Sequence, residues 1–106
     1  MELILYEQAE GRSPFKEWLS DLRDKVAHAR ILTRLRQVEA GNLGDCAPVG
    51  EGVLELRIHV GAGFRVYCGR SGNEWVILLC GGDKASQKKD IQGAKQFWAD
   101  WKRRQA

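Results

Sequence analysis

The chain has 106 residues, a formal net charge of +3 and 43% hydrophobic residues. A chain of this length buries roughly two thirds of its unfolded surface, so we expect a single domain, residues 1–106, that needs no metal or disulfide to fold. The three cysteines are widely spaced and odd in number, which excludes a disulfide framework and makes a zinc site improbable.

The first residues carry two glutamates and only a short apolar run, so they fit neither a signal peptide nor a membrane span. We therefore expect a cytoplasmic protein that does not contact a membrane. Residues 84–106 contain seven basic and two acidic residues, a net charge of +5, whereas the first 83 residues carry −2. This asymmetry favours an anionic partner, although from charge alone a solvated amphipathic helix is the simpler interpretation.

A short strand is expected from Leu3 to Tyr6. Ser13 and Pro14 then predict the start of a helix, as its N-cap and first helical residue. Its apolar stripe consists of Phe15, Trp18, Leu19 and Leu22.

A second helix is expected over residues 25–40, and Gly41 fits the left-handed position after its end. Its inward residues are predicted to be Ala27, Ile31, Leu35 and Val38, and its exposed faces to carry Arg30, Arg34 and Arg36. Residues 42–52 contain Pro48 and three glycines, so a loop is expected there.

Apolar and polar residues alternate from Val53 to Val60 and again from Phe64 to Cys68, which predicts an antiparallel hairpin around Gly61-Ala62-Gly63. A three-residue loop sets His59 against Arg65, and it keeps all the polar residues on one face, whereas a two-residue loop would mix the faces. The polar patch predicted on this face consists of Glu55, Arg57, His59, Arg65 and Tyr67.

The segment from Trp75 to Cys80 is apolar throughout, as expected of an interior strand covered on both faces. It continues into Gly81-Gly82-Asp83-Lys84, and Ser86 is the expected N-cap of a last helix that ends near Arg104. The element order is β-α-α-β-β-β-α. It predicts an α+β fold with a helical hairpin packed on a small, mainly antiparallel sheet.

Several segments together are similar to one known family. They are Gly50-Glu51-Gly52-Val53, Glu55-Leu56-Arg57-Ile58, Gly63-Phe64-Arg65-Val66-Tyr67, Leu78-Leu79-Cys80-Gly81-Gly82-Asp83-Lys84, Ser86-Gln87 and Asp90-Ile91. With these residues the chain resembles the RelE/ParE superfamily of toxins from bacterial type II toxin-antitoxin modules, and within it the addiction-module killer proteins of the HigB-like branch.

The resemblance implies a small growth-arresting toxin that is neutralised by a cognate antitoxin, usually a helix-turn-helix DNA-binding protein in this branch. Many members cut mRNA on the ribosome without a metal, whereas ParE-like members inhibit DNA gyrase and cut no RNA. A shared fold does not choose between these activities. The leading hypothesis is a ribosome-dependent mRNA endoribonuclease without a cofactor. The alternatives are a gyrase inhibitor and a degenerate member that only binds its antitoxin. The sequence does not indicate the oligomeric state.

Cleavage of RNA without a metal needs a proton acceptor for the 2′-hydroxyl, a proton donor for the 5′-oxygen and cations at the phosphate. Arg65 matches the family's arginine that contacts the scissile phosphate in nuclease members, and Arg57 shares its face. Lys84 is expected to add a second cation or transfer a proton, and His59 is the acid–base candidate because an ordinary histidine titrates near neutral pH. The alternatives are an ion pair of Arg65 with Glu55 or Asp83, and a histidine that only fills the polar face.

Four further residues are candidates for RNA binding. Tyr67 is expected either to stack on a base or to cap the core. Gln87, Lys88 and Lys89 begin the last helix, where backbone N–H groups and these side chains could hold a phosphate. Asp83 is expected to orient Lys84 or cap this helix. The chain departs from the family in two ways: it has no Tyr or His after Asp83, and Glu55 and Arg57 stand where RelE-like members have two lysines.

Overall fold

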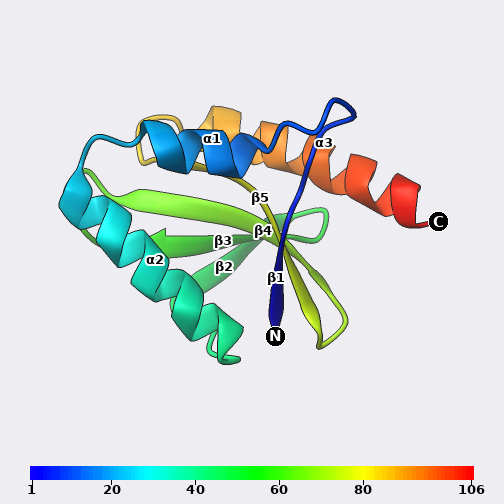
Figure 1. The fold of residues 1–106 in the computed structure, drawn as a ribbon, viewed down its shortest axis with the longest axis horizontal. Coiled ribbons are helices and arrows are strands. Elements are labelled where there is room, and N and C mark those ends of the chain that lie inside the picture. Colours follow the sequence, from blue (N-terminus) through cyan, green and yellow to red (C-terminus); the bar gives the residue numbers. More distant parts are fainter.

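The structure is a computed structural model that describes all residues, 1–106. A five-stranded mixed sheet forms its middle layer, with three helices packed around it (Figure 1). The elements are β1 (Glu2–Leu5), α1 (Pro14–Asp21), α2 (Lys25–Glu39), β2 (Cys46–Gly50), β3 (Val53–Ile58), β4 (Phe64–Ser71), β5 (Trp75–Asp83) and α3 (Gln87–Gln105). This confirms the predicted α+β class, and the architecture is compatible with a RelE-like fold.

The strand order in the sheet is β1-β5-β4-β3-β2. β1 pairs in parallel with β5, and the other neighbours are antiparallel, so the sheet is mainly antiparallel as predicted. The loop expected over residues 42–52 is wrong in part, because Cys46–Gly50 form strand β2 along β3. Pro48 and Gly50 are typical of a loop, so the sequence did not predict a strand here. An edge strand tolerates proline, and the register of β2 shifts between these two residues.

The helix starts follow the signals in the sequence. The Ser13 side chain accepts a hydrogen bond from the backbone N–H of Lys16, and Asp24 does the same for Ala27 at the start of α2. Gly41 has φ 96° just after α2, as expected of a left-handed helix end. Ser86 occupies the N-cap position of α3 but caps no backbone N–H. Its hydroxyl donates instead to the carboxylate of Asp90.

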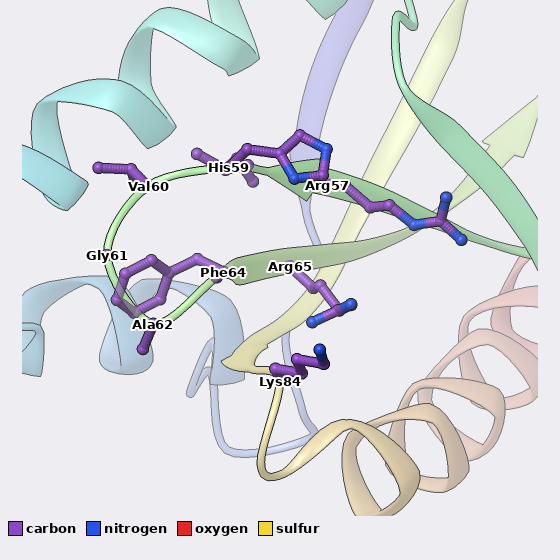
Figure 2. A pocket seen from close by; sticks show the side chains of 10 residues that line it. Arg57, His59, Val60, Gly61, Ala62, Phe64, Arg65 and Lys84 are labelled. Atoms are coloured by element: carbon purple, nitrogen blue, oxygen red, sulfur yellow. The ribbon is translucent and has the colours of Figure 1, made fainter.

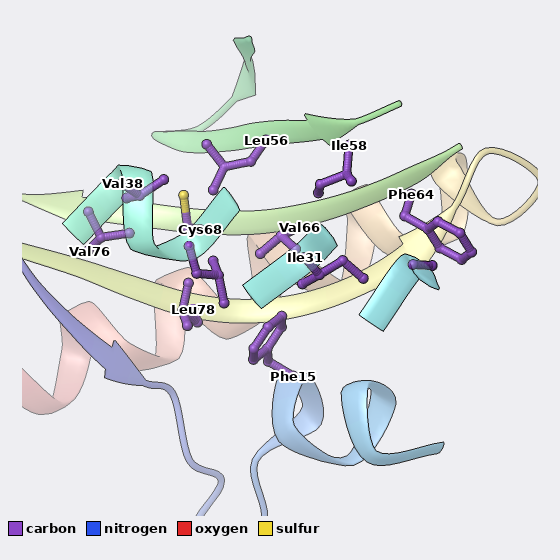
Figure 3. Close-up of a cluster of buried hydrophobic side chains, with 12 residues drawn as sticks. Phe15, Ile31, Val38, Leu56, Ile58, Phe64, Val66, Cys68, Val76 and Leu78 are labelled. Atoms are coloured by element: carbon purple, nitrogen blue, oxygen red, sulfur yellow. The ribbon is translucent and has the colours of Figure 1, made fainter. Parts of the chain in front are cut away.

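Two apolar clusters pack on the two faces of the sheet. α1 and α2 cover one face through Phe15, Ile31 and Val38, which pack with Leu56 and Val66 (Figure 3). The other face is covered by α3, whose residues Ala94 and Trp98 pack with Val53, Tyr67, Ile77 and Leu79. The sheet is therefore buried on both sides, in line with the apolar sequence of β5.

A β-bulge in β5 changes which residues face α3. Cys68 pairs with Leu78 and Tyr67 pairs with Cys80, so Leu79 is the additional residue. After the bulge, Gly82 faces α3, where an added Cβ would overlap the Asp90 carboxylate. None of the three helices combines the length and apolar character that a membrane crossing requires.

Candidate cationic site

The β3–β4 hairpin carries the site, and its register differs from the prediction by two residues. Arg57 pairs with Arg65 and Ile58 with Phe64, so the loop has five residues, 59–63, instead of three. The odd loop length was correct, and Arg57 and Arg65 therefore share the face that was predicted. Beyond this pair the chain turns: the backbone N–H of Gly63 donates to the carbonyl of Val60 at 2.9 Å, and that of Val60 donates to the carbonyl of Ile58 at 3.1 Å. As a consequence, His59 lies in the loop and not on the sheet.

Three rows of paired residues on the α3 side lead from the core to the site. Val53, Gly69 and Ile77 form the first row, where Gly69 leaves room for the ring of Trp98. Glu55, Tyr67 and Cys80 form the second row, beneath the first turns of α3. The third row consists of Arg57, Arg65 and Gly82. The face thus changes from apolar to cationic along the strands.

Glu55 is the buried anchor of this face, with 1% of the residue exposed. Its carboxylate accepts hydrogen bonds from Arg57 Nε at 3.1 Å and Gln87 Nε2 at 2.9 Å, and lies 3.5 Å from Arg65 Nε. Burial alone would raise the pKa of Glu55, but the bonds from Gln87 and Arg57 and the charge of Arg65 outweigh it, so the pKa is lowered. A permanent negative charge therefore lies between two arginines that face each other across the strands.

A hollow of about 410 Å³ opens beside these arginines (Figure 2). Its cationic side chains are Arg57, Arg65 and Lys84, and the hairpin loop forms its opposite wall. Arg65 contacts Glu55 only through Nε, so its two Nη groups have no protein partner. The ammonium of Lys84 makes no ion pair, and Asp83 does not orient it, because the Asp83 carboxylate accepts from the backbone N–H of Ser86 at 3.1 Å. Of the two ion pairs considered for Arg65, the one with Glu55 is present.

His59 borders the hollow and is bound to an acidic residue that the sequence analysis missed. Its Nε2 lies 2.5 Å from the carboxylate of Asp45, and 76% of its side chain is exposed. Asp45 also lies 3.5 Å from Arg57 Nη1. The hydrogen bond to His59 lowers the pKa of Asp45, assisted by the charge of Arg57. Asp45 directly precedes the unpredicted strand β2, so no sequence signal placed it beside His59.

The candidates for RNA binding occupy different environments. Tyr67 is fully buried beneath α3, so its ring offers no exposed face to a base. Burial also raises its pKa, with a further contribution from the charge of Glu55. Gln87 donates its side-chain amide to Glu55. Lys88 and Lys89 are exposed on the first turn of α3 and form no ion pair.

Arg34 was predicted on an exposed face of α2, and this is wrong because only 8% of it is exposed. Its guanidinium donates to three backbone carbonyls, those of Leu43, Asp45 and Arg57, at 2.5, 2.9 and 3.2 Å. Because β2 pairs with β3, the residues just before β2 lie against α2, and the carbonyls of Leu43 and Asp45 accept hydrogen bonds from Arg34. This side chain therefore fixes the backbone on which Asp45 and Arg57 are placed.

No group of three or more His, Cys, Asp or Glu side chains lies close enough to hold a metal ion. Fold and site together define an α+β protein with a solvent-open cationic hollow, in which a buried carboxylate lies behind two arginines.

Residues 17–98 match the family described as "Phage derived protein Gp49-like (DUF891)", a toxin-like family of addiction modules, and the chain belongs to this family. A relative in Haemophilus influenzae, described as "Uncharacterized protein", is 48% identical over 81 residues, which are 76% of this chain and 82% of the relative. The family match includes every residue of the hollow.

Proposed function

We propose that the protein is the toxin of a type II toxin-antitoxin module, of the RelE/ParE superfamily and its HigB-like branch, and that it cleaves mRNA on the ribosome without a metal. Membership in the Gp49-like family supports the toxin part of this proposal. The nuclease part is supported by one observation above all. Arg57, Arg65 and Lys84 converge on one open hollow, and the Nη groups of Arg65 and the ammonium of Lys84 lack protein partners.

The hollow suits a phosphate of the RNA backbone. A guanidinium presents paired N–H donors that match two phosphate oxygens. The Glu55 carboxylate lies 3.5 Å from Arg65 Nε as an ion-pair contact without a hydrogen bond, and the two Nη groups of Arg65 have no protein partner. Arg57 and Lys84 add positive charge where the negative charge of the pentacoordinate transition state develops. Donors that are already oriented before the reaction stabilise such charge most effectively.

In the proposed reaction His59 Nδ1 accepts the proton of the 2′-hydroxyl, while Asp45 holds Nε2 and thereby orients the ring. The 2′-oxygen forms a bond to phosphorus as the bond from phosphorus to the 5′-oxygen breaks. Lys84 donates the proton that the leaving 5′-oxygen takes up. The products are a 2′,3′-cyclic phosphate and a 5′-hydroxyl end, so atoms and charges balance without a further reactant.

The proposed antitoxin covers the Arg57/Arg65 face. A second candidate surface for the antitoxin, the tryptophan-bearing face of α3, is less available. Trp98 is buried on the sheet, and Trp101 stacks on it with a centroid distance of 5.2 Å. An antitoxin segment with acidic side chains would complement the cationic groups of this face and block the entry of RNA.

The experiment is 5′-end mapping of mRNA from a translating extract after addition of purified protein. Arg65→Ala is compared with Arg70→Ala, an exposed arginine on the same strand whose side chain contacts Gly72 and Asn73. We expect codon-phased cuts with the wild type and Arg70→Ala, and a rate reduced about 10²- to 10³-fold in Arg65→Ala, typical of losing one charge-stabilising donor. Uncut messages together with growth arrest by the wild type would refute the nuclease and direct attention to gyrase. Uncut messages with normal growth would indicate a member that only binds its antitoxin.

A further inference from the structure

A second hollow, of about 340 Å³, lies on the other side of Arg57 and His59. It is bordered by one face of α2 and by the segment Gly44–Asp45, and it shares Arg57, Ile58 and His59 with the first hollow. The two hollows therefore meet at the end of β3, and the proposed cleavage reaction uses none of the residues that α2 contributes to the second one.

The boundary between the hollows lies where β3 extends beyond the paired part of β2. β2 begins at Cys46, opposite Leu56, so β3 extends past its neighbour at Arg57 and Ile58. The backbone groups of Arg57 are already paired, its N–H with Asp45 and its carbonyl with Arg34. The boundary between the hollows consequently offers no free strand edge to an added strand.

The second hollow is cationic on its helical wall. Arg30 and Arg34 lie one turn apart on α2 and both line it. Arg34 is more than nine-tenths buried, and its Nη1 has no hydrogen-bond partner. Arg30 is exposed and forms no ion pair, and the one acidic residue of α2, Glu39, lies at the far end of the helix. The carboxylate of Asp45 at the rim is already shared between His59 and Arg57. Two like charges one turn apart weaken a helix, and a bound anion would offset that repulsion.

We propose that this second hollow is a phosphate subsite for single-stranded RNA, with Arg30 as the contacting cation and Arg34 as the charged wall behind it. The inference rests on the proposed function, because it extends the RNA path from Arg65 past His59 to α2. The lining contains no Phe, Tyr or Trp on which a base could stack, and its one aromatic ring, that of His59, is bound to Asp45 at the border with the first hollow. This subsite therefore contacts the backbone and adds affinity without sequence preference.

The test is the equilibrium binding of fluorescently labelled RNA in which 2′-deoxy substitution prevents cleavage, measured by anisotropy over a range of salt concentrations. The nonanucleotide is chosen to reach both hollows, and the trinucleotide serves as the short comparison. Arg30→Ala is compared with Arg36→Ala, which removes an exposed arginine of the same helix that lines neither hollow. Both variants lose one charge, so they differ only in where it is lost.

We expect Arg30→Ala to weaken binding of the nonanucleotide by about threefold to tenfold and to reduce the salt slope of log K by about 0.7, the value for one phosphate contact on a single strand. The trinucleotide and the Arg36→Ala variant should show the wild-type behaviour. Equal weakening by the two variants, or equal weakening for both RNA lengths, would overturn the subsite because net charge alone would then explain the effect.

The result is independent of cleavage, because no ribosome and no reactive 2′-hydroxyl are present. Arg65→Ala in the same assay reports on the first hollow. Loss of trinucleotide binding in Arg65→Ala without any effect of Arg30→Ala would leave the proposed function standing and remove the subsite. An effect of Arg30→Ala in a protein that leaves ribosome-bound mRNA intact would support the subsite and contradict the nuclease.

Discussion

Replacing Glu55 by Gln should destabilise the protein in a way that depends on pH. The substitution keeps the shape of the side chain and an oxygen that can accept from Gln87 Nε2. It removes the negative charge that lies between Arg57 Nε and Arg65 Nε. Two arginines directly across the strands would then face each other with Asp45, 3.5 Å from Arg57 Nη1, as the one remaining counter-charge.

The magnitude follows from burial and from the number of charged partners. Breaking a fully buried ion pair costs about 3–5 kcal/mol, and one charge-assisted hydrogen bond contributes about 1.5–3 kcal/mol. The Arg57 side chain is 38% exposed, so water compensates part of its loss, whereas the Arg65 side chain is only 15% exposed. We therefore expect a loss of about 2–3 kcal/mol in the free energy of unfolding, which lowers the melting temperature by roughly 10–20 °C in a domain of this size.

The pH dependence has a definite sign. The pKa of Glu55 in the folded protein is lowered from its ordinary value of 4.5. The stabilisation by its charge is therefore complete above the unfolded pKa and is lost as the pH falls through the lower folded pKa. The difference in unfolding free energy between the wild type and Glu55→Gln should be constant near neutral pH and shrink below about pH 4.5.

Urea unfolding of both proteins between neutral and acidic pH measures this difference. Glu51→Gln is the control, because Glu51 is a surface carboxylate, 72% exposed, that lies 3.6 Å from Lys95. A stability difference that stays constant through the acidic range, or an equal loss in Glu51→Gln, would refute the assignment of Glu55 as the charged anchor of the site.

Two further predictions concern the α3 side of the sheet. Gly82→Ala places a Cβ on the Asp90 carboxylate and should lower the free energy of unfolding by about 1–3 kcal/mol. Gly93→Ala within α3, where the nearest atom is 4.0 Å away, should raise it by about 0.5–1 kcal/mol. Denaturant unfolding that ranks the two variants in the opposite order would contradict the packing. Burial raises the pKa of Tyr6 to about 12 and also raises that of Tyr67. Because these are the only two tyrosines, the folded protein should show no tyrosinate absorbance near pH 10, unlike the urea-unfolded chain, and stability should fall as the pH rises above 10.

The faces of the hairpin could be predicted from the sequence because alternation with a period of two is a local property. Arg57 and Arg65 share a face for any loop with an odd number of residues, so the prediction holds although the loop has five residues and not three. The register itself could not be predicted, since loops of three and of five residues give the same faces, and the alternation does not show that the N–H of Gly63 bonds to the carbonyl of Val60 inside the loop. For this reason His59 was expected on the sheet and lies in the loop.

The contacts missed from the sequence are those between elements that are not neighbours in the chain. Asp45 contacts His59 only because β2 forms the edge of the sheet. The sequence did not predict β2, because Pro48 within it is typical of a loop. Arg34 follows the helical pattern of an exposed residue, yet the segment before β2 folds over it and supplies two of its three carbonyl partners. Periodicity describes one element at a time, so it cannot reveal a side chain that is buried by a distant loop.

The glycines after the β5 core link the fold to the site. The bulge at Leu79 turns Gly82 towards α3, and the absence of a side chain there lets Asp90 approach the sheet. With the first turn of α3 this close, Gln87 donates to Glu55, which in turn accepts a hydrogen bond from Arg57 Nε and lies 3.5 Å from Arg65 Nε as an ion pair. Gly82 also lies next to Arg65 in its row, so the guanidinium borders the hollow without a neighbouring side chain on β5. One bulged residue thus sets the distance between α3 and the sheet, and this distance determines which edge of each arginine remains available to a phosphate.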